Sequence, residues 1–97
     1  MVARFVIALE ARAPGRNLGR AYGLEATQGL FGTWVVELRH GRIGGGRVRL
    51  LAFENEAAAR AEIRRRLKRR ATAPGRIGTG YQVVDLHGGA WLEGAGA

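Results

Sequence analysis

The most chemically suggestive stretch of the sequence is the run His40–Arg47, HGRIGGGR, which holds four glycines and two arginines. Glycine lets a backbone bend sharply or approach a ligand closely, and the planar guanidinium group of arginine binds phosphate. Nucleotide-binding loops of the Rossmann and Walker types connect a strand to a helix, whose N-terminus holds the anion. This run lies instead between two strand-like segments, and no lysine follows its glycines. It is therefore predicted to be a strand-to-strand turn, with His40 and the arginines as a recognition edge.

Basic residues cluster on both sides of this turn. The predicted nucleic-acid contacts on the recognition edge are Arg39, His40, Gly41, Arg42, Arg47 and Arg49. Because the flanking strands are expected to pair, some of these side chains must project together from rigid strand ends. We therefore expect a basic patch at the turn.

A second group of cations lies on a helix predicted over Glu54–Ala71. It has seven basic residues between positions 60 and 70, with three like-charge pairs four positions apart, such as Arg64 with Lys68. Such pairs cost helix stability, which favours an anionic partner. Arg64 and Lys68 are therefore predicted as further nucleic-acid contacts, and a solvated helix surface is the alternative.

Catalytic chemistry has few candidates in this sequence. It contains no cysteine and no serine, which excludes thiolate and serine nucleophiles, disulfides and the common structural zinc sites. The two histidines, His40 and His87, have no acid or nucleophile at a recognisable spacing, and the acidic residues are scattered singly. We therefore predict a protein that is not an enzyme, with no metal site, no cofactor and no small-molecule substrate.

Length and charge indicate one small basic domain. The chain has 97 residues, of which 46% are hydrophobic, and its net charge is +8. This charge favours a polyanionic partner, with nucleic acid first, and a compositional bias towards arginine is the alternative. The apolar run Phe5–Leu9 is shorter than the roughly 7–15 residues of a signal peptide, and no segment approaches the ~18 apolar residues of a membrane helix. We therefore predict a cytoplasmic protein with no membrane partner.

The hydrophobic periodicity predicts an α+β fold. The helix over Glu54–Ala71 has Asn55 as its N-cap and a narrow apolar stripe of Ala59, Ile63 and Leu67, which suits packing on a sheet face. Five strands are expected, over Arg4–Glu10, Arg20–Gly29, Thr33–His40, Arg47–Phe53 and Tyr81–Leu86. We therefore predict an antiparallel β-sheet of about five strands with one α-helix packed on it.

The remaining segments are predicted to be loops and a tail. Turn residues indicate loops over Ala11–Gly19 and Thr72–Gly80. Residues 1–87 are expected to form the domain, and residues 88–97 a C-terminal tail or a short hairpin. Among the aromatic residues, Trp34, Phe53 and Tyr81 are expected in the core, whereas Tyr22 and Trp91 have base stacking as an alternative to packing.

Several of these features occur in the order found in a known domain family. They are Arg20 and Tyr22 at a strand start, Phe31-Gly32 before Trp34, the triplet His40-Gly41-Arg42 followed by Ile43-Gly44, Phe53 with Ala59 and Ile63 along the helix, and Gly80-Tyr81. From about Phe5 to Leu86 the chain resembles the WGR domain of DNA-dependent poly(ADP-ribose) polymerases and many bacterial proteins. The resemblance implies a stand-alone bacterial module with an antiparallel sheet and one helix, which works by nucleic-acid binding, with DNA before RNA, and by domain contact.

The family is named for a Trp-Gly-Arg triplet, and here the triplet is His40-Gly41-Arg42. In the polymerases the tryptophan packs against the end of a broken DNA strand, and the arginine makes an interdomain contact. The imidazole of His40 offers less stacking area than an indole, whereas Arg42 is retained.

Two functions are consistent with these patterns. The first is a non-catalytic nucleic-acid-binding module that contacts phosphates through the glycine-rich turn and the basic helix. The second is a protein–protein interaction module that acts with a separate nucleic-acid enzyme. The second function predicts an apolar patch near Phe31, Trp34 or Trp91.

Overall fold

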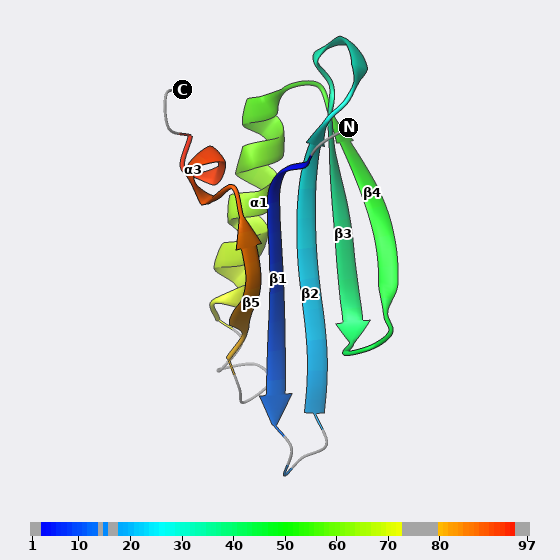
Figure 1. Cartoon of the computed structure of the whole chain (residues 1–97), viewed down its shortest axis with the longest axis vertical. Helices are drawn as coiled ribbons and strands as arrows, with labels where there is room; N and C mark the ends of the chain where they lie inside the picture. Colours follow the sequence, from blue (N-terminus) through cyan, green and yellow to red (C-terminus); the bar gives the residue numbers. More distant parts are fainter. Residues whose placement is uncertain (1–2, 14, 16–17, 73–79, 95–97) are drawn as a thin grey trace.

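Five strands form one antiparallel sheet with a 15-residue helix on one of its faces (Figure 1). This computed structural model describes residues 3–13, 15, 18–72 and 80–94. The sheet order is β4-β3-β2-β1-β5, which confirms the predicted α+β architecture. The strands are β1 (Ala3–Ala13), β2 (Leu18–Gln28), β3 (Trp34–Arg42), β4 (Arg47–Phe53) and β5 (Gln82–His87). The helices are α1 (Glu56–Arg70) and α3 (Gly89–Leu92), and a single 3-10 turn, η2 (Leu30–Gly32), lies in the loop between β2 and β3.

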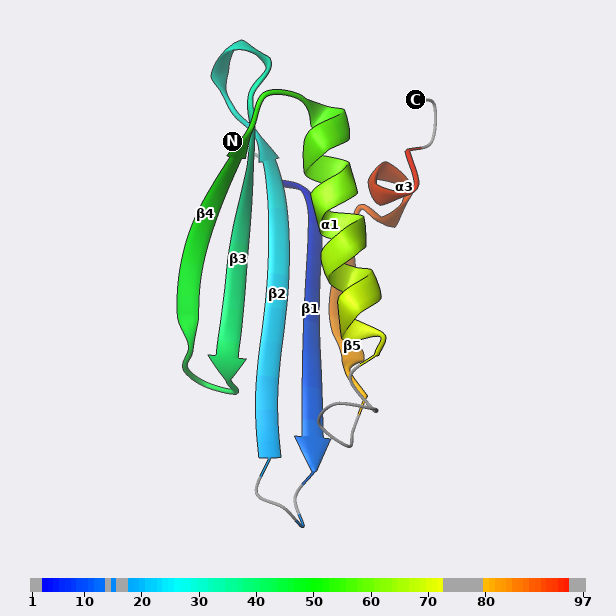
Figure 2. The ribbon, with the colours of Figure 1, turned by 180° about the vertical axis from the view of Figure 1, so that it is seen from behind.

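The core lies between the sheet and α1, which covers only one face (Figure 2). Side chains alternate along each central strand, so every second residue of β1, β2 and β3 points under the helix. The buried strand residues are Phe5, Ile7, Leu9, Ala11, Tyr22, Leu24, Ala26, Trp34, Val36 and Leu38. From the helix, Ala59 and Ile63 are fully buried and Leu67 is partly buried, which confirms the predicted stripe.

Helix α1 begins where the sequence predicts an N-cap. The backbone amide of Ala58 donates a hydrogen bond to the side-chain oxygen of Asn55 at 2.9 Å. Glu56 lies in the first turn, and Lys68, Arg69 and Arg70 lie in the last, so both ends complement the helix dipole. None of the described helices is long and apolar enough to span a membrane.

The strands differ from the predicted ranges mainly at the ends of the first hairpin and of β3. β1 and β2 are each 11 residues long and pair from Ala13–Leu18 onward, so they take in much of the predicted loop Ala11–Gly19. β3 continues two residues past His40, to Arg42. Residues 14, 16–17 and 73–79 of the two predicted loops lie outside the described residues.

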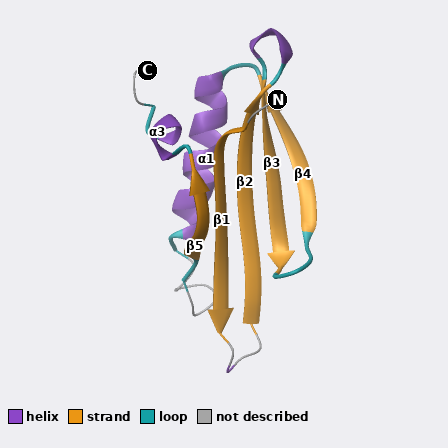
Figure 3. Ribbon diagram, viewed as in Figure 1, coloured by secondary structure: helices purple, strands orange, loops and turns teal. Residues whose placement is uncertain are grey.

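A short helix, α3, lies where a tail or a short hairpin is predicted, and residues 95–97 of that segment lie outside the described residues (Figure 3). The Trp91 ring stacks on Phe5 at 5.8 Å and on Trp34 at 5.3 Å between ring centroids. The carbonyl oxygen of Trp91 accepts a hydrogen bond from Nε of Arg60 at 2.6 Å. Packing against two core aromatic rings therefore holds α3 on the domain, and Trp91 is a packing residue.

Candidate nucleic-acid interface

The glycine-rich run forms a tight turn between β3 and β4, as predicted. The amide of Gly45 donates to the carbonyl of Arg42 at 3.0 Å, and Gly44 has φ 85°, the value of the third residue of a type II turn. A Cβ atom added at Gly46 would lie 2.5 Å from the carbonyl oxygen of His40. The glycines therefore allow the two strands to close at this end.

Ile43 attaches this turn to the neighbouring strand β2. Its backbone amide donates to the carbonyl of Gly19 at 3.2 Å. Its side chain lies over Gly19, where an added Cβ atom would be 3.5 Å from Cδ1 of Ile43. The turn is thus supported by three strands, and the residues on each side of it have fixed positions.

The strand register brings most of the predicted recognition edge onto one face. His40 lies opposite Arg47 on β4 and opposite Tyr22 on β2. Leu38, which faces the core, lies opposite Arg49. Because side chains alternate, the exposed basic residues on the helix-bearing side form one group, here called the basic face. Its members are Arg20, His40, Arg42, Arg47 and Arg49.

The basic face holds two arginines directly opposite each other, and a histidine opposite a third arginine. Arg20 lies opposite Arg42, and His40 lies opposite Arg47. The sequence has no aspartate or glutamate between Leu38 and Phe53. Like charges in direct cross-strand positions destabilise a sheet, so this end of the protein carries an uncompensated positive potential.

The helix adds one cation to this face that the sequence analysis missed. The guanidinium carbon of Arg70 lies 3.8 Å from the centroid of the Tyr22 ring. Since Tyr22 is the register neighbour of His40, Arg70 lies beside the basic face. The sequence did contain a signal for Arg70: it lies seven residues after Ile63, and a spacing of seven returns to the same side of a helix. Arg20, also missed, is two residues from Tyr22 and so shares its face.

Arg39 does not join the basic face. It alternates with Leu38 and His40, so its side chain lies on the side of the sheet away from α1. There its Nη2 is 2.9 Å from Oε1 of Glu37. Gly41 contributes backbone only. Of the six predicted residues of the recognition edge, Arg39 is therefore separated from the others.

The predicted helix contacts Arg64 and Lys68 also lie apart from the basic face. Nε of Arg64 donates to the carbonyl of Leu92, the last residue of α3, at 2.9 Å. Lys68 is one turn further along the same side of α1 and is exposed. α3 packs against β1, so this side of the helix is directed away from β3 and β4. These two cations belong to a different surface because the helix repeat separates them from Arg70.

Several other cations of α1 have structural roles. Arg60 is 8% exposed, and its Nη2 lies 3.1 Å from Oε1 of Glu56. Arg66 lies 2.6 Å from Glu62, and Arg65 pairs with the same carboxylate. The helix therefore does not present the continuous cationic surface that its sequence indicates.

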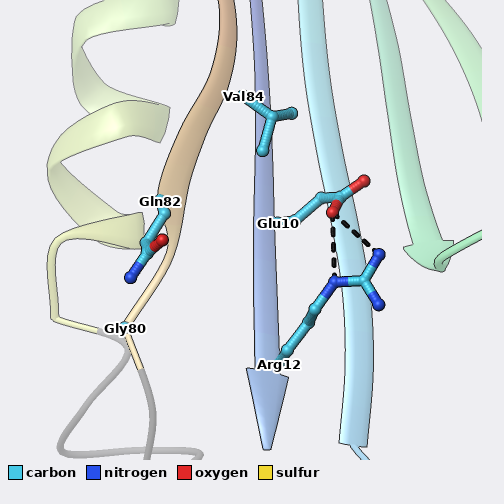
Figure 4. A pocket seen from close by; sticks show the side chains of 5 residues that line it. All are labelled: Glu10, Arg12, Gly80, Gln82 and Val84. Atoms are coloured by element: carbon cyan, nitrogen blue, oxygen red, sulfur yellow. Dashed lines mark hydrogen bonds and ion pairs between the residues drawn. The ribbon is translucent and has the colours of Figure 1, made fainter.

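A shallow cavity of about 270 Å³ lies on the opposite side of the sheet (Figure 4). It is lined by Glu10, Arg12, Gly80, Gln82 and Val84. Nη2 of Arg12 is 3.1 Å from Oε1 of Glu10, so the carboxylate already has a cationic partner. Among the described residues, no group of three or more His, Cys, Asp or Glu side chains could hold a metal ion.

Comparison of the chain with protein-family models, curated proteins and solved structures finds no match.

Proposed function

We propose that the chain is a non-catalytic nucleic-acid-binding module whose basic face contacts the phosphates of DNA. One observation carries this proposal: Arg20 lies opposite Arg42 and His40 opposite Arg47, and the sequence has no acid between Leu38 and Phe53. The guanidinium groups of Arg20 and Arg42 repel each other in the free protein. The phosphates of a nucleic acid would neutralise them and release counterions.

The spacing of the basic face suits a polyanion. Residues two apart on one strand are about 7 Å apart, and neighbouring strands are about 4.8 Å apart. Arg47 and Arg49 on β4, with His40 and Arg42 on β3, therefore form a small two-dimensional array of donors. Because these residues lie on paired strands, their backbone loses little conformational entropy when a ligand binds.

We further propose that the chain is a stand-alone, bacterial WGR-like module of the cytoplasm. The order of its motifs supports this assignment, as does the sheet-and-helix architecture that the resemblance implies. Two of the three residues of the triplet, His40 and Arg42, contribute their side chains to the basic face.

Fluorescence anisotropy with labelled single-stranded, blunt duplex and nicked DNA, and with RNA, tests the proposal at about 50 and 200 mM salt. We expect DNA binding that weakens steeply with salt, and a further loss in the double variant Arg42→Ala/Arg47→Ala. The matched control is Arg39→Ala/Lys68→Ala, which removes the same charge from outside the basic face. Absence of binding at the lower salt, or an equal loss in the control, would contradict the proposal.

A second candidate function, protein–protein interaction, is favoured by the loop between β2 and β3. Phe31 is 100% exposed and Leu30 is 72% exposed. Trp34 and Trp91, the other residues where an apolar patch was expected, stack on each other instead. The loop is thus an apolar protrusion that would fit a pocket on a partner protein.

Affinity purification of the tagged full chain from cells of its source, with the wild type and Phe31→Ser, tests this second function. A partner enzyme of nucleic-acid metabolism that is retained by the wild type and lost from the variant would support it. Identical sets of retained proteins would argue against a role for the loop.

A further inference from the structure

Arg70 differs in its contacts from Arg64, Arg65 and Arg66 of the same helix, whereas Arg60 also lies over an aromatic ring, that of Trp91 at 4.7 Å. Arg60, Arg65 and Arg66 have carboxylate partners, and Arg64 binds a carbonyl group. Arg70 instead lies over the Tyr22 ring at 3.8 Å from its centroid. A guanidinium group that stacks on an aromatic ring keeps its N–H edges directed sideways, where they can donate to an oxyanion.

The ring below Arg70 has a fixed position in the core. Tyr22 is 2% exposed, and Tyr81 contacts its ring edge-on at 6.5 Å between centroids. The buried hydroxyl of Tyr22 has no hydrogen-bond partner among the described residues. The contribution of Tyr22 at this place is therefore its flat ring, which supports the guanidinium group of Arg70.

Donors from two elements meet at this point. Tyr22 lies opposite His40, whose exposed side chain is on the same side of the sheet. Arg47 follows His40 in the same row, on β4. Successive strands are about 4.8 Å apart, so an oxyanion above β2 and β3 has the helix end on one side and the sheet donors on the other.

We propose that Arg70 and His40 together form a discrete phosphate-binding site, with Tyr22 as the positioning residue for Arg70. This inference rests on the proposed function, because the phosphate group is one of a bound nucleic-acid backbone. Tyr22 acts only through Arg70 and does not touch the ligand.

The dependence of DNA affinity on salt provides the test, because each phosphate contact contributes about 0.9 to the slope of log K against log salt for duplex DNA. A blunt duplex is the probe. Arg70→Ala is expected to lower this slope by about 0.9, since one contact is lost. Arg70→Lys is expected to restore little of the affinity, because an ammonium group neither stacks on the ring nor presents a planar fork. Lys68→Ala, which removes the same charge from the other side of α1, is expected to leave the slope unchanged.

Variants of Tyr22 test the positioning role. Tyr22→Phe keeps the ring and is expected to bind DNA as the wild type does. Tyr22→Leu removes the ring and is expected to reproduce the slope of Arg70→Ala. The fold of Tyr22→Leu is checked by circular dichroism. If Tyr22→Leu does not fold, Arg70→Lys tests the contact instead, because an ammonium group does not stack on the Tyr22 ring.

The outcomes separate this inference from the proposed function. No DNA binding by the wild type at about 50 mM salt overturns both. Binding that depends on Arg42 and Arg47, with an unchanged slope in Arg70→Ala, overturns only the site at Arg70. Titration with inorganic phosphate, followed by NMR, identifies the source of the ligand. Tight binding of free phosphate that Arg70→Ala abolishes, with unchanged DNA binding, would also overturn the inference.

Discussion

Phe31 has a backbone conformation that aromatic residues rarely adopt. Its φ is 57°, in the left-handed region, and its side chain is fully exposed. The loop is held by its neighbours, because the amide of Gly29 donates to the carbonyl of Thr33 at 2.8 Å and the Thr33 hydroxyl donates to the carbonyl of Leu30 at 2.7 Å. Backbone strain of this kind is often found where a residue has a binding role, which agrees with the second candidate function.

This strain gives a prediction at the level of single residues. Phe31→Gly removes the left-handed penalty without removing a packed side chain, so we expect the melting temperature to rise by about 4 °C. Leu30→Gly is the matched control, since Leu30 is also exposed but has no positive φ. It should lower the melting temperature, because glycine loses more conformational entropy on folding. Differential scanning calorimetry checks both variants, and a lower melting temperature for Phe31→Gly would show that the loop is not strained.

The turn between β3 and β4 allows a similar test at the level of an element. Gly46 has φ 105°, and a Cβ atom there would lie 2.5 Å from the carbonyl of His40. Gly46→Ala should therefore destabilise the protein by about 2–4 kcal/mol, from backbone strain and overpacking together. Gly45→Ala is the control, because an added Cβ atom would meet nothing within 4 Å. Urea unfolding measures both changes, and equal changes would mean that the turn tolerates a side chain at Gly46.

The short helix α3 is the other element with a measurable contribution. Trp91 stacks on Phe5 and Trp34, and its indole Nε1 donates to Oε2 of Glu56 at 3.3 Å. Trp91→Ala should lower the free energy of unfolding by about 3 kcal/mol, because it leaves a cavity over two aromatic rings. Urea unfolding followed by circular dichroism measures the loss. A loss below about 1 kcal/mol would contradict a core role for this residue.

The elements themselves were largely predictable from the sequence, because alternation and helical periodicity depend on local residues. The glycine-rich run was predicted to connect two strands for the same reason, because the segments on both sides of it alternate. α3 was not predictable, since its position depends on stacking of Trp91 on two rings that are distant in sequence. The role of Arg64 depends in turn on α3, because its partner is the carbonyl of Leu92.

The composition of the candidate site was only partly predictable, for a related reason. Because side chains alternate along β3, Arg39 and His40 must lie on opposite faces of the sheet. The face on which Arg39 lies could therefore be predicted from the sequence. The position of Arg20 opposite Arg42 depends on the register of β2 with β3, which no local pattern specifies. The stacking of Arg70 on Tyr22 also required the three-dimensional packing of the helix.

Charge is distributed unevenly over the whole molecule. The face of the sheet away from α1 carries acidic as well as basic residues, and three acids there have basic partners two positions away. These pairs are Glu10 with Arg12, Glu37 with Arg39, and Asp85 with His87. The basic face has no acid in the sequence between Leu38 and Phe53. Positive charge among the described residues is therefore concentrated on the helix-bearing side of the sheet, which would orient the protein towards a polyanion.

This distribution predicts how stability responds to ions. The repulsion among the arginines of the basic face, such as Arg20 and the opposite Arg42, is screened by salt. The melting temperature should therefore rise as NaCl increases from about 10 to 100 mM, where the Debye length falls from ~30 to ~10 Å. Phosphate at matched ionic strength should raise it further, because an anion that binds only the folded state stabilises it. Excluded-ion effects of phosphate act on any protein, so the informative quantity is the excess over NaCl.

The variants identify the source of this excess. Arg42→Gln/Arg47→Gln should reduce it, whereas Arg39→Gln/Lys68→Gln, with the same change in net charge, should leave it as in the wild type. The physical difference is that only the first pair lies in the array of neighbouring basic side chains that a phosphate can bridge. An excess that is equal in both variants would mean that phosphate acts through general exclusion, and that the basic face is not an anion-binding surface.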